Sequence, residues 1–237
     1  MRQNRHPQQL RDIRLECGYN RYAEGSAFLE WGHNKIIATV SIEDRLPRHL
    51  HQLKGHKGGW LTAEYGMLPR STDTRSQRPR LYDSGRTQEI QRLISRSLRS
   101  VVDLNLFDRQ TLLVDIDVLQ ADGGTRCAGI LAGYAALHHA ANELIRSGRL
   151  SEWPLRYEIA AVSVGMVQGK PHIDLEYSED SIAEVDLNVV ATADGDILEV
   201  QGGSEEQPIA AEAYVQLIAS GVTAVQHILN TVRPLLR

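Results

Sequence analysis

The stretch Asp115–Ile130, DIDVLQADGGTRCAGI, joins a strand pattern to a helix pattern through a glycine turn. Val114, Ile116 and Val118 alternate with aspartates, as in a strand that buries one of its faces. After the turn, small and apolar residues continue to about Arg146. The stretch therefore predicts a strand, a tight turn, and a long helix whose alanines and glycines allow a neighbour to pack unusually close.

Strand hairpins followed by a helix are predicted in both halves of the chain. In the first half, strands at 27–42, interrupted by a turn at 32–34, and at 60–65 precede an amphipathic helix at 90–102. In the second half we expect strands at 157–167, 172–177, 185–193 and 197–200, then a helix at 208–233 with Pro208 at its first position. The order predicts one α+β domain over residues 1–237, with a pattern that points to pseudo-duplication.

Composition excludes several classes of protein. With 237 residues and 42% hydrophobic content, the chain can bury one substantial core. It has no run of about 18 apolar residues, and its first residues are polar and basic, so we expect a soluble cytoplasmic protein with no membrane partner. The two cysteines, Cys17 and Cys127, are far apart, which gives no support to a disulfide framework or a thiolate zinc site.

The net charge of -4 conceals two segments of opposite sign. Residues 69–99 contain eight arginines, no lysine and three acids, whereas residues 174–186 contain six acids and no Lys or Arg. Such segments suit phosphate binding and divalent-cation binding respectively. Two solvated surface faces are the alternative interpretation.

The glycine turn is the sharpest local signal for chemistry. Gly123 and Gly124 let the backbone approach an anion, the amides at the helix start point towards it, and Thr125 can cap the helix or donate its hydroxyl. Arg126 adds a planar fork that suits phosphate. The alternative is an ordinary glycine turn with a threonine cap. A nucleoside-triphosphate P-loop and a Rossmann site are excluded, because GxxxxGK[ST] and GxGxxG are absent.

A second helix start carries a similar glycine and arginine. Gly85, Arg86 and Thr87 precede the amphipathic helix, and two such starts on one domain could clamp one phosphate. A cation at a helix N-terminus is electrostatically unfavourable unless it has an anionic partner. For Arg86 that partner could also be Glu89 or Asp83 within the chain.

A pair of aspartates is the candidate metal site. Asp180 and Asp186 lie six residues apart beside a strand, where both carboxylates could meet on one magnesium ion. Neither Cys127 nor a histidine has an evident partner that would make a nucleophile system. The residues thus indicate a phosphate clamp and a metal site without a covalent nucleophile.

Four segments resemble, in order, the signatures of the ribonuclease PH family of bacterial phosphorolytic exoribonucleases. They are GGWLTAEYGMLPRSTDTR from Gly58, GRTQEIQRLISRSLRSVVDL from Gly85, DIDVLQADGGTRCAGI from Asp115 and EDSIAEVDLNVVAT from Glu179. The similarity extends over about residues 23–202 and implies the family's fold, a two-layer α+β sandwich of mixed sheets and helices. Ser95, where glycine is common, and QGGSEE from Gln201, where a QGT-type sequence is usual, depart from the pattern, so RNA grip and subunit contacts can differ there.

The resemblance implies a role for each candidate residue. Arg86, Gly124, Thr125 and Arg126 would bind phosphate, and Asp180 and Asp186 would hold Mg²⁺ or Mn²⁺, with the two arginines and the two aspartates forming the catalytic set. Arg70, Arg75 and Arg78 would contact RNA and support ring assembly.

The implied activity is phosphorolysis of RNA 3′ ends, chiefly those of tRNA precursors, by a homohexamer built as a trimer of dimers. Inorganic phosphate is the co-substrate, nucleoside 5′-diphosphates are the products, and the reaction is reversible. Two rival interpretations are a catalytically silent ring subunit, which the retained arginines and aspartates oppose, and polynucleotide phosphorylase, for which the chain is too short.

Overall fold

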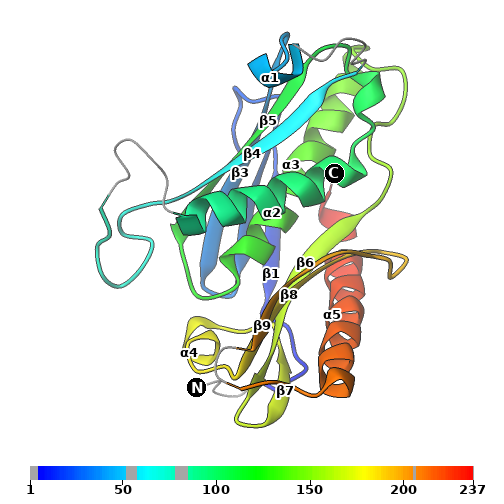
Figure 1. Ribbon diagram of the computed structural model, residues 1–237. Helices are drawn as coiled ribbons and strands as arrows, with labels where there is room; N and C mark the ends of the chain where they lie inside the picture. The colour runs from blue at the N-terminus through cyan, green and yellow to red at the C-terminus, as the bar shows by residue number, and fades with distance from the viewer. Residues whose placement is uncertain (1–4, 52–57, 78–84, 205–206, 237) are drawn as a thin grey trace.

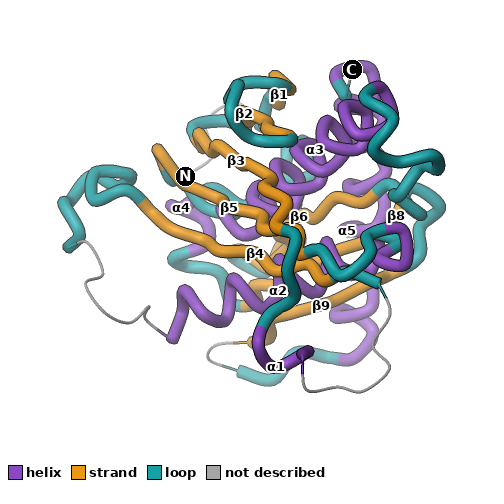
Figure 2. The backbone as a smooth tube through the Cα atoms, turned by 90° about the horizontal axis from the view of Figure 1, so that it is seen from above, coloured by secondary structure: helices purple, strands orange, loops and turns teal. Residues whose placement is uncertain are grey.

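The computed structural model describes residues 5–51, 58–77, 85–204 and 207–236. Five strands form the first sheet, in the order β1-β2-β3-β5-β4 (Figure 2). Its strands are β1 (Ile13–Cys17), β2 (Gly25–Trp31), β3 (Asn34–Glu43), β4 (Trp60–Met67) and β5 (Thr111–Gln120). All neighbours pair antiparallel except β4 and β5, which run parallel. A parallel pair needs a crossover connection, and helix α2 (Gly85–Val101) lies in it.

Helix α3 (Thr125–Arg146) follows β5 and is buried on nearly all sides. It packs against β2 and β3 of the first sheet and against β6 of the second, so it lies between the two sheets. Its glycines face α2: a Cβ on Gly133 would lie 2.8 Å from Cδ1 of Leu98, and one on Gly129 would lie 3.3 Å from Cδ1 of Ile94. The predicted close packing of this helix is confirmed.

The second sheet has the order β7-β6-β8-β9 and is antiparallel throughout. Its strands are β6 (Ile159–Val167), β7 (Lys170–Ile173), β8 (Val185–Thr192) and β9 (Ile197–Ser204). Helix α5 (Ala211–Val232) covers the face opposite α3, and Gly221 lets it approach Val189 of β8 (Figure 1). Short helices complete the fold: α1 (Arg48–His51), α4 (Tyr177–Asp180), η1 (Leu104–Leu106) and η2 (Arg233–Leu235).

The chain is thus an α+β sandwich of two stacked layers, each a sheet with its own helices, as predicted. The first sheet with α2 and α3 is one layer, and the second sheet with α5 is the other (Figure 1). A single cluster of buried apolar side chains runs through both layers. None of the described helices is both long and apolar enough to cross a membrane.

Four local features differ from the predictions. The strand expected to reach Tyr177 ends at Ile173, because the chain turns there and forms α4. The last helix begins at Ala211, so Pro208 precedes it rather than occupying its first position. Strand β1 was not predicted, and the predicted loop at 43–59 contains the short helix α1 in its described part.

Candidate active site

The turn between β5 and α3 requires both of its glycines. Gly123 and Gly124 have φ angles of 68° and 69°, in the left-handed region that disfavours side chains. A Cβ on Gly123 would also lie 2.7 Å from the backbone of Glu176 and Tyr177. Gly124 is the N-cap of α3, and the amides of the first helical turn have no partner within the helix. The turn therefore presents backbone donors at one point, as an anion requires.

Side chains from distant parts of the chain hold this turn in place. Asn34, fully buried in β3, donates from Nδ2 to the carbonyl of Gly123 at 2.7 Å and accepts at Oδ1 from the amide of Asp122 at 2.6 Å. Arg11 donates from Nη1 to the carbonyl of Asp122 at 2.5 Å and from Nη2 to that of Gly123 at 3.4 Å. Neither Asn34 nor Arg11 was singled out from the sequence.

Thr125 does not cap its helix. It is the first residue of α3, and its Oγ1 lies 2.8 Å from the hydroxyl oxygen of Tyr65 on β4. Burial raises the pKa of Tyr65, against the opposing effects of its hydrogen bond to Thr125 and the charges of Arg86 and Arg126, so this phenol stays protonated at neutral pH. The capping interpretation was wrong, and Tyr65 is a site residue that the sequence pattern did not reveal.

The two candidate arginines lie at the starts of different helices. Both Arg86, exposed at the start of α2, and Arg126, on the first turn of α3, act electrostatically on Tyr65. Nη1 of Arg126 lies 3.8 Å from Oε1 of Glu89, which also accepts at 2.8 Å from Nε2 of Gln201 on β9. Glu89 thus pairs with Arg126. Between α2 and β9 lies a groove of about 360 Å³ lined by Gly85, Gln88, Glu89, Arg92, Leu93, Arg96, Glu199 and Gln201.

The two candidate aspartates belong to the second layer. Asp180 is the last residue of α4, and Asp186 lies on β8 opposite Gly165 and Gly203. Asp186 shares a face of β8 with Asn188, whose Oδ1 accepts at 3.1 Å from the thiol of Cys127 on α3. Burial raises the pKa of the Cys127 thiol, the charge of Arg126 lowers it and that of Asp186 raises it. Asp186 therefore faces the start of α3, where Arg126 lies.

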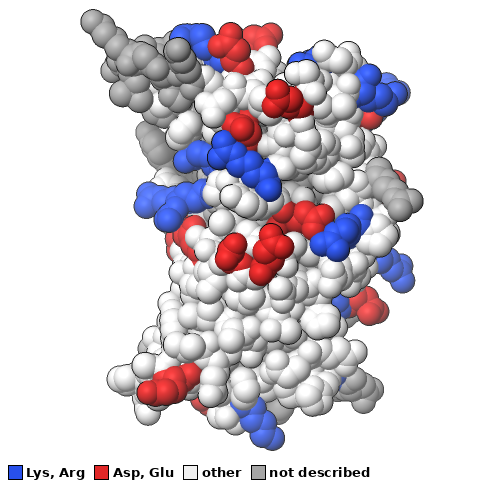
Figure 3. Space-filling view, turned by 90° about the vertical axis from the view of Figure 1, so that its right-hand side faces the viewer, with Lys and Arg blue, Asp and Glu red and all other residues white. Residues whose placement is uncertain are grey.

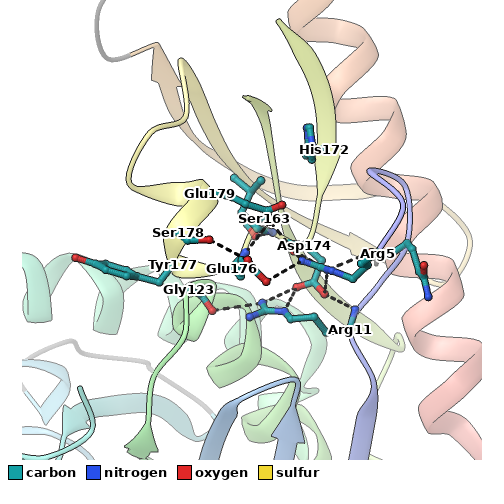
Figure 4. Close-up of polar contacts among 12 residues, drawn as sticks. Arg5, Arg11, Gly123, Ser163, His172, Asp174, Glu176, Tyr177, Ser178 and Glu179 are labelled. Carbon is teal, nitrogen blue, oxygen red and sulfur yellow. Dashed lines mark hydrogen bonds and ion pairs between the residues drawn. The ribbon is translucent and has the colours of Figure 1, made fainter. Parts of the chain in front are cut away.

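Much of the acidic segment is not a solvated face. Asp174 and Glu179 are only 2% exposed, and their partners come from the first residues of the chain (Figure 4). Arg11 donates from Nε and Nη2 to Oδ1 of Asp174 at 3.0 and 2.6 Å. Arg5 donates to Oδ2 of Asp174 at 3.2 Å and to Oε2 of Glu179 at 3.3 Å. These two carboxylates are structural counter-ions of Arg11, which is buried, and of Arg5, which is partly buried.

The arginines of residues 69–99 lie in different surroundings. Arg70 and Arg75 lie exposed in the segment after β4, whereas Arg78 lies outside the described residues. Arg96 pairs with Glu199 at 3.4 Å. Arg99 stacks 3.8 Å from the ring centre of Trp60 and donates to the carbonyl of Leu61, so it braces α2 against β4.

A glycine turn at a helix start, followed by a threonine hydroxyl and an arginine, presents the kinds of donor that phosphate binding requires. The chain belongs to the 3′ exoribonuclease family: the family's domain 1 model matches residues 9–143 and its domain 2 model matches residues 157–223.

Relatives agree with this assignment. The chain is 49% identical over 224 residues to "Ribonuclease PH" of Deinococcus radiodurans, covering 94% of this chain and 90% of that protein. Two solved structures share the fold. Rrp46 of rice (Oryza sativa) has a TM-score of 0.78, 20% identity and 99% coverage of both chains. A chain of the Archaeoglobus fulgidus exosome with RNA bound to the active site has a TM-score of 0.79 and 21% identity, covering 96% of this chain and 90% of that one.

Proposed function

We propose that the chain is a phosphate-dependent 3′ to 5′ exoribonuclease that trims the 3′ ends of tRNA precursors and other RNAs in the cytoplasm. The observation that carries the proposal is the glycine turn at the start of α3, where Thr125 contacts Tyr65 and Arg126 follows, in a chain that belongs to this family. Burial raises the pKa of Tyr65, but the charges of Arg86 and Arg126 both act to lower it, which supports placing Arg86 on the same side as Arg126. Two arginines and a turn of backbone amides are well suited to holding inorganic phosphate.

The reaction follows from the position of the bound phosphate. One phosphate oxygen attacks the phosphorus of the last phosphodiester, and the bond from that phosphorus to the 3′-oxygen of the preceding nucleotide breaks. The shortened RNA keeps its 3′-hydroxyl, and a nucleoside 5′-diphosphate leaves. Because a phosphodiester is exchanged for a phosphoanhydride, the reaction runs backward when diphosphates are abundant.

Each phosphate-binding residue has a separate task. Arg126 and Arg86 neutralise the approaching anion and the charge that develops during transfer, and the Gly124 amide and the Thr125 hydroxyl orient the nucleophile. The Tyr65 hydroxyl can donate to Oγ1 of Thr125, which leaves the threonine proton for phosphate. No strong base is required, because phosphate is already an anion.

The donor set suits a magnesium or manganese ion bound by Asp180 and Asp186. No cluster of three or more His, Cys, Asp or Glu in the described residues could hold a metal by itself. Magnesium, however, is commonly bound by one or two carboxylates together with waters and substrate phosphates. A Cβ on Gly203, the strand partner of Asp186, would meet no described atom within 4 Å, so β9 leaves open space at this position of the strand pair. When bound, the ion stabilises negative charge on the transferring phosphorus group.

The proposed assembly is a homohexamer built from three dimers. The outer face of α5 supports it: Glu212 is the only charged residue of this helix, and Val215 is 63% exposed. Figure 3 shows interspersed charges on the upper half of this face and few on the lower half, where α5 lies. Exposed Arg70 and Arg75, together with Arg78, are proposed to contact the duplexed body of tRNA, because exposed arginines bind RNA phosphates.

A single experiment tests the activity. Purified protein is incubated with a tRNA that carries a short 3′ extension, with magnesium, and with or without inorganic phosphate. We expect nucleoside diphosphates and a shortened tRNA only when phosphate is present. Release of nucleoside monophosphates without phosphate would indicate hydrolysis and contradict the proposal. An intact tRNA in both reactions would contradict it as well.

A further inference from the structure

The side chain of Arg11 is buried against the carbonyl side of the glycine turn. Its side chain is only 7% exposed, and its guanidinium contacts the carbonyls of Asp122 and Gly123 and the carboxylate of Asp174. A Cβ on Gly124 would lie 3.2 Å from Nη2 of Arg11, so the guanidinium adjoins the residue proposed to bind phosphate through its amide.

The contact between Arg11 and the turn fixes the direction of an amide. In a trans peptide unit, the carbonyl of one residue and the N–H of the next point in opposite directions. The Gly123 carbonyl is bound from behind by Arg11 and by Asn34. The N–H of Gly124, in the same peptide unit, therefore points away from these two side chains.

Arg11 is itself fixed by Asp174, whose geometry is strained. Asp174 has a φ angle of 54°, which is uncommon for residues other than glycine. Besides the Arg11 side chain, its carboxylate accepts from the Arg11 amide at 2.6 Å and from Nε1 of Trp31 at 3.0 Å. The loop that carries Asp174 is tied to β6, since the Asp174 amide donates to the Ser163 carbonyl at 2.6 Å.

We propose that Arg11 is a positioning residue for phosphate: held by Asp174, it fixes the carbonyls of Asp122 and Gly123 so that the Gly124 amide points to the bound anion. The inference rests on the proposed function of the turn. Because Asp174 offsets the charge of Arg11, the effect acts through the geometry of the turn, and a planar guanidinium that reaches three acceptors at once is needed for it.

The test compares two arginines that share Asp174. Arg11 contacts the turn, whereas Arg5 reaches Asp174, Glu176 and Glu179. The KM for phosphate and the KM for RNA are measured for Arg11→Ala, Arg11→Lys and Arg5→Ala, with thermal unfolding of each variant. We expect Arg11→Ala to raise the KM for phosphate by at least about tenfold while the KM for RNA changes little. Arg5→Ala should lower stability and leave the KM for phosphate near its original value.

Arg11→Lys and one further variant, Arg126→Ala, make every outcome decisive. If Arg11→Ala does not fold, Arg11→Lys decides, because lysine keeps the charge beside Asp174 but not the planar fork; an unchanged KM for phosphate in folded Arg11→Lys would overturn the proposal. Equal phosphate KM values for folded Arg11→Ala and Arg5→Ala would do the same. Arg126→Ala is measured in parallel: a normal phosphate dependence in that variant would refute the phosphate site itself, whereas a defect there without one in the Arg11 variants would refute only the positioning role.

Discussion

The starts of α3 and α2 both carry a glycine followed closely by an arginine, yet the structure treats them differently. At α3, a Cβ on Gly123 would collide with backbone, and Asn34, Arg11 and Tyr65 hold the turn and its threonine from three sides. At α2, a Cβ on Gly85 would meet no atom of the described residues within 4 Å, and Arg86 is exposed.

This difference separates geometry from charge. The start of α3 is rigid and defines where an anion can sit, whereas the start of α2 supplies a positive charge on a solvent-exposed side chain. A rigid site depends on the shape of each contributor, while an exposed charge tolerates small displacements. Substitutions at the two helix starts should therefore have unequal effects.

The largest effect is expected for Arg126→Ala. Losing a partly buried guanidinium that is proposed to bind the transferring group should reduce phosphorolysis by on the order of a hundredfold or more. Arg86→Ala should cost less, because its exposed charge is screened by solvent. Initial rates of nucleoside diphosphate release measure the activity of both variants. Arg146→Ala, at the far end of α3, serves as the control. A larger defect in Arg86→Ala than in Arg126→Ala would reverse the comparison between the two helix starts.

Gly123→Ala should come next, and Gly85→Ala is its matched control. The first substitution forces a side chain into a left-handed backbone against Glu176 and Tyr177, which should cost about 1–3 kcal/mol of unfolding free energy as well as much of the activity. The second adds a methyl group that meets no atom of the described part of the chain, so stability and activity should both stay unchanged. Thermal unfolding and rate are recorded together. Equal melting temperatures and rates for the pair would show that the turn is not rigid.

A smaller effect is expected for Asp186→Asn. Asp186 lies in the second layer and faces the start of α3. We expect a rate reduction of about tenfold that is partly restored by high magnesium, because a ligand amide binds the ion more weakly than a carboxylate does. Asp180→Asn should behave in the same way, and exposed Asp194→Asn serves as the control. Full activity of the Asp186 and Asp180 variants in the presence of a chelator would remove the metal from these two positions.

The smallest effect should come from Arg75→Ala, in the exposed segment that leads towards α2. Loss of one contact to an RNA phosphate should weaken tRNA binding. It should also reduce the slope of the log binding constant against log salt concentration by slightly less than one, with little change for a short single-stranded RNA. Binding is compared at a measured oligomeric state, with Arg45→Ala as a charge-matched control. Equal losses for tRNA and the short RNA in assembled protein would assign this segment to another role.

The fold could be predicted where its signal is local. The alternation at 114–118 and the helical spacing from Ile90 mark β5 and α2 directly, and both are present. Strand β1 also alternates in burial, but it is a five-residue edge strand whose signal is too short to stand out. Helix α4 has a capping box formed by Glu176 and Glu179, which a search for a Ser or Thr cap does not find.

The candidate site divides in the same way. Gly123, Gly124 and the residues that follow could be identified because glycine flexibility and a helix start are adjacent in the sequence. Asn34, Tyr65 and Arg11 could not, because each becomes a partner of the turn only through strand pairing or a long-range contact. The acidic segment was ambiguous for the same reason: the charges that neutralise Asp174 and Glu179 belong to the first residues of the chain.

The bond between Arg11 and Asp174 also bears on when the site can form. The two residues are 163 positions apart, and contacts at such a separation carry a high loop-closure cost and slow folding. During synthesis, the glycine turn at 122–124 leaves the ribosome before Asp174 has been added to the chain. In the nascent chain, the turn is therefore present without Asp174 to hold Arg11 against it. With Arg11 in the proposed role, phosphate binding would be acquired late, only after the strands of the second sheet have begun to fold back on the first layer.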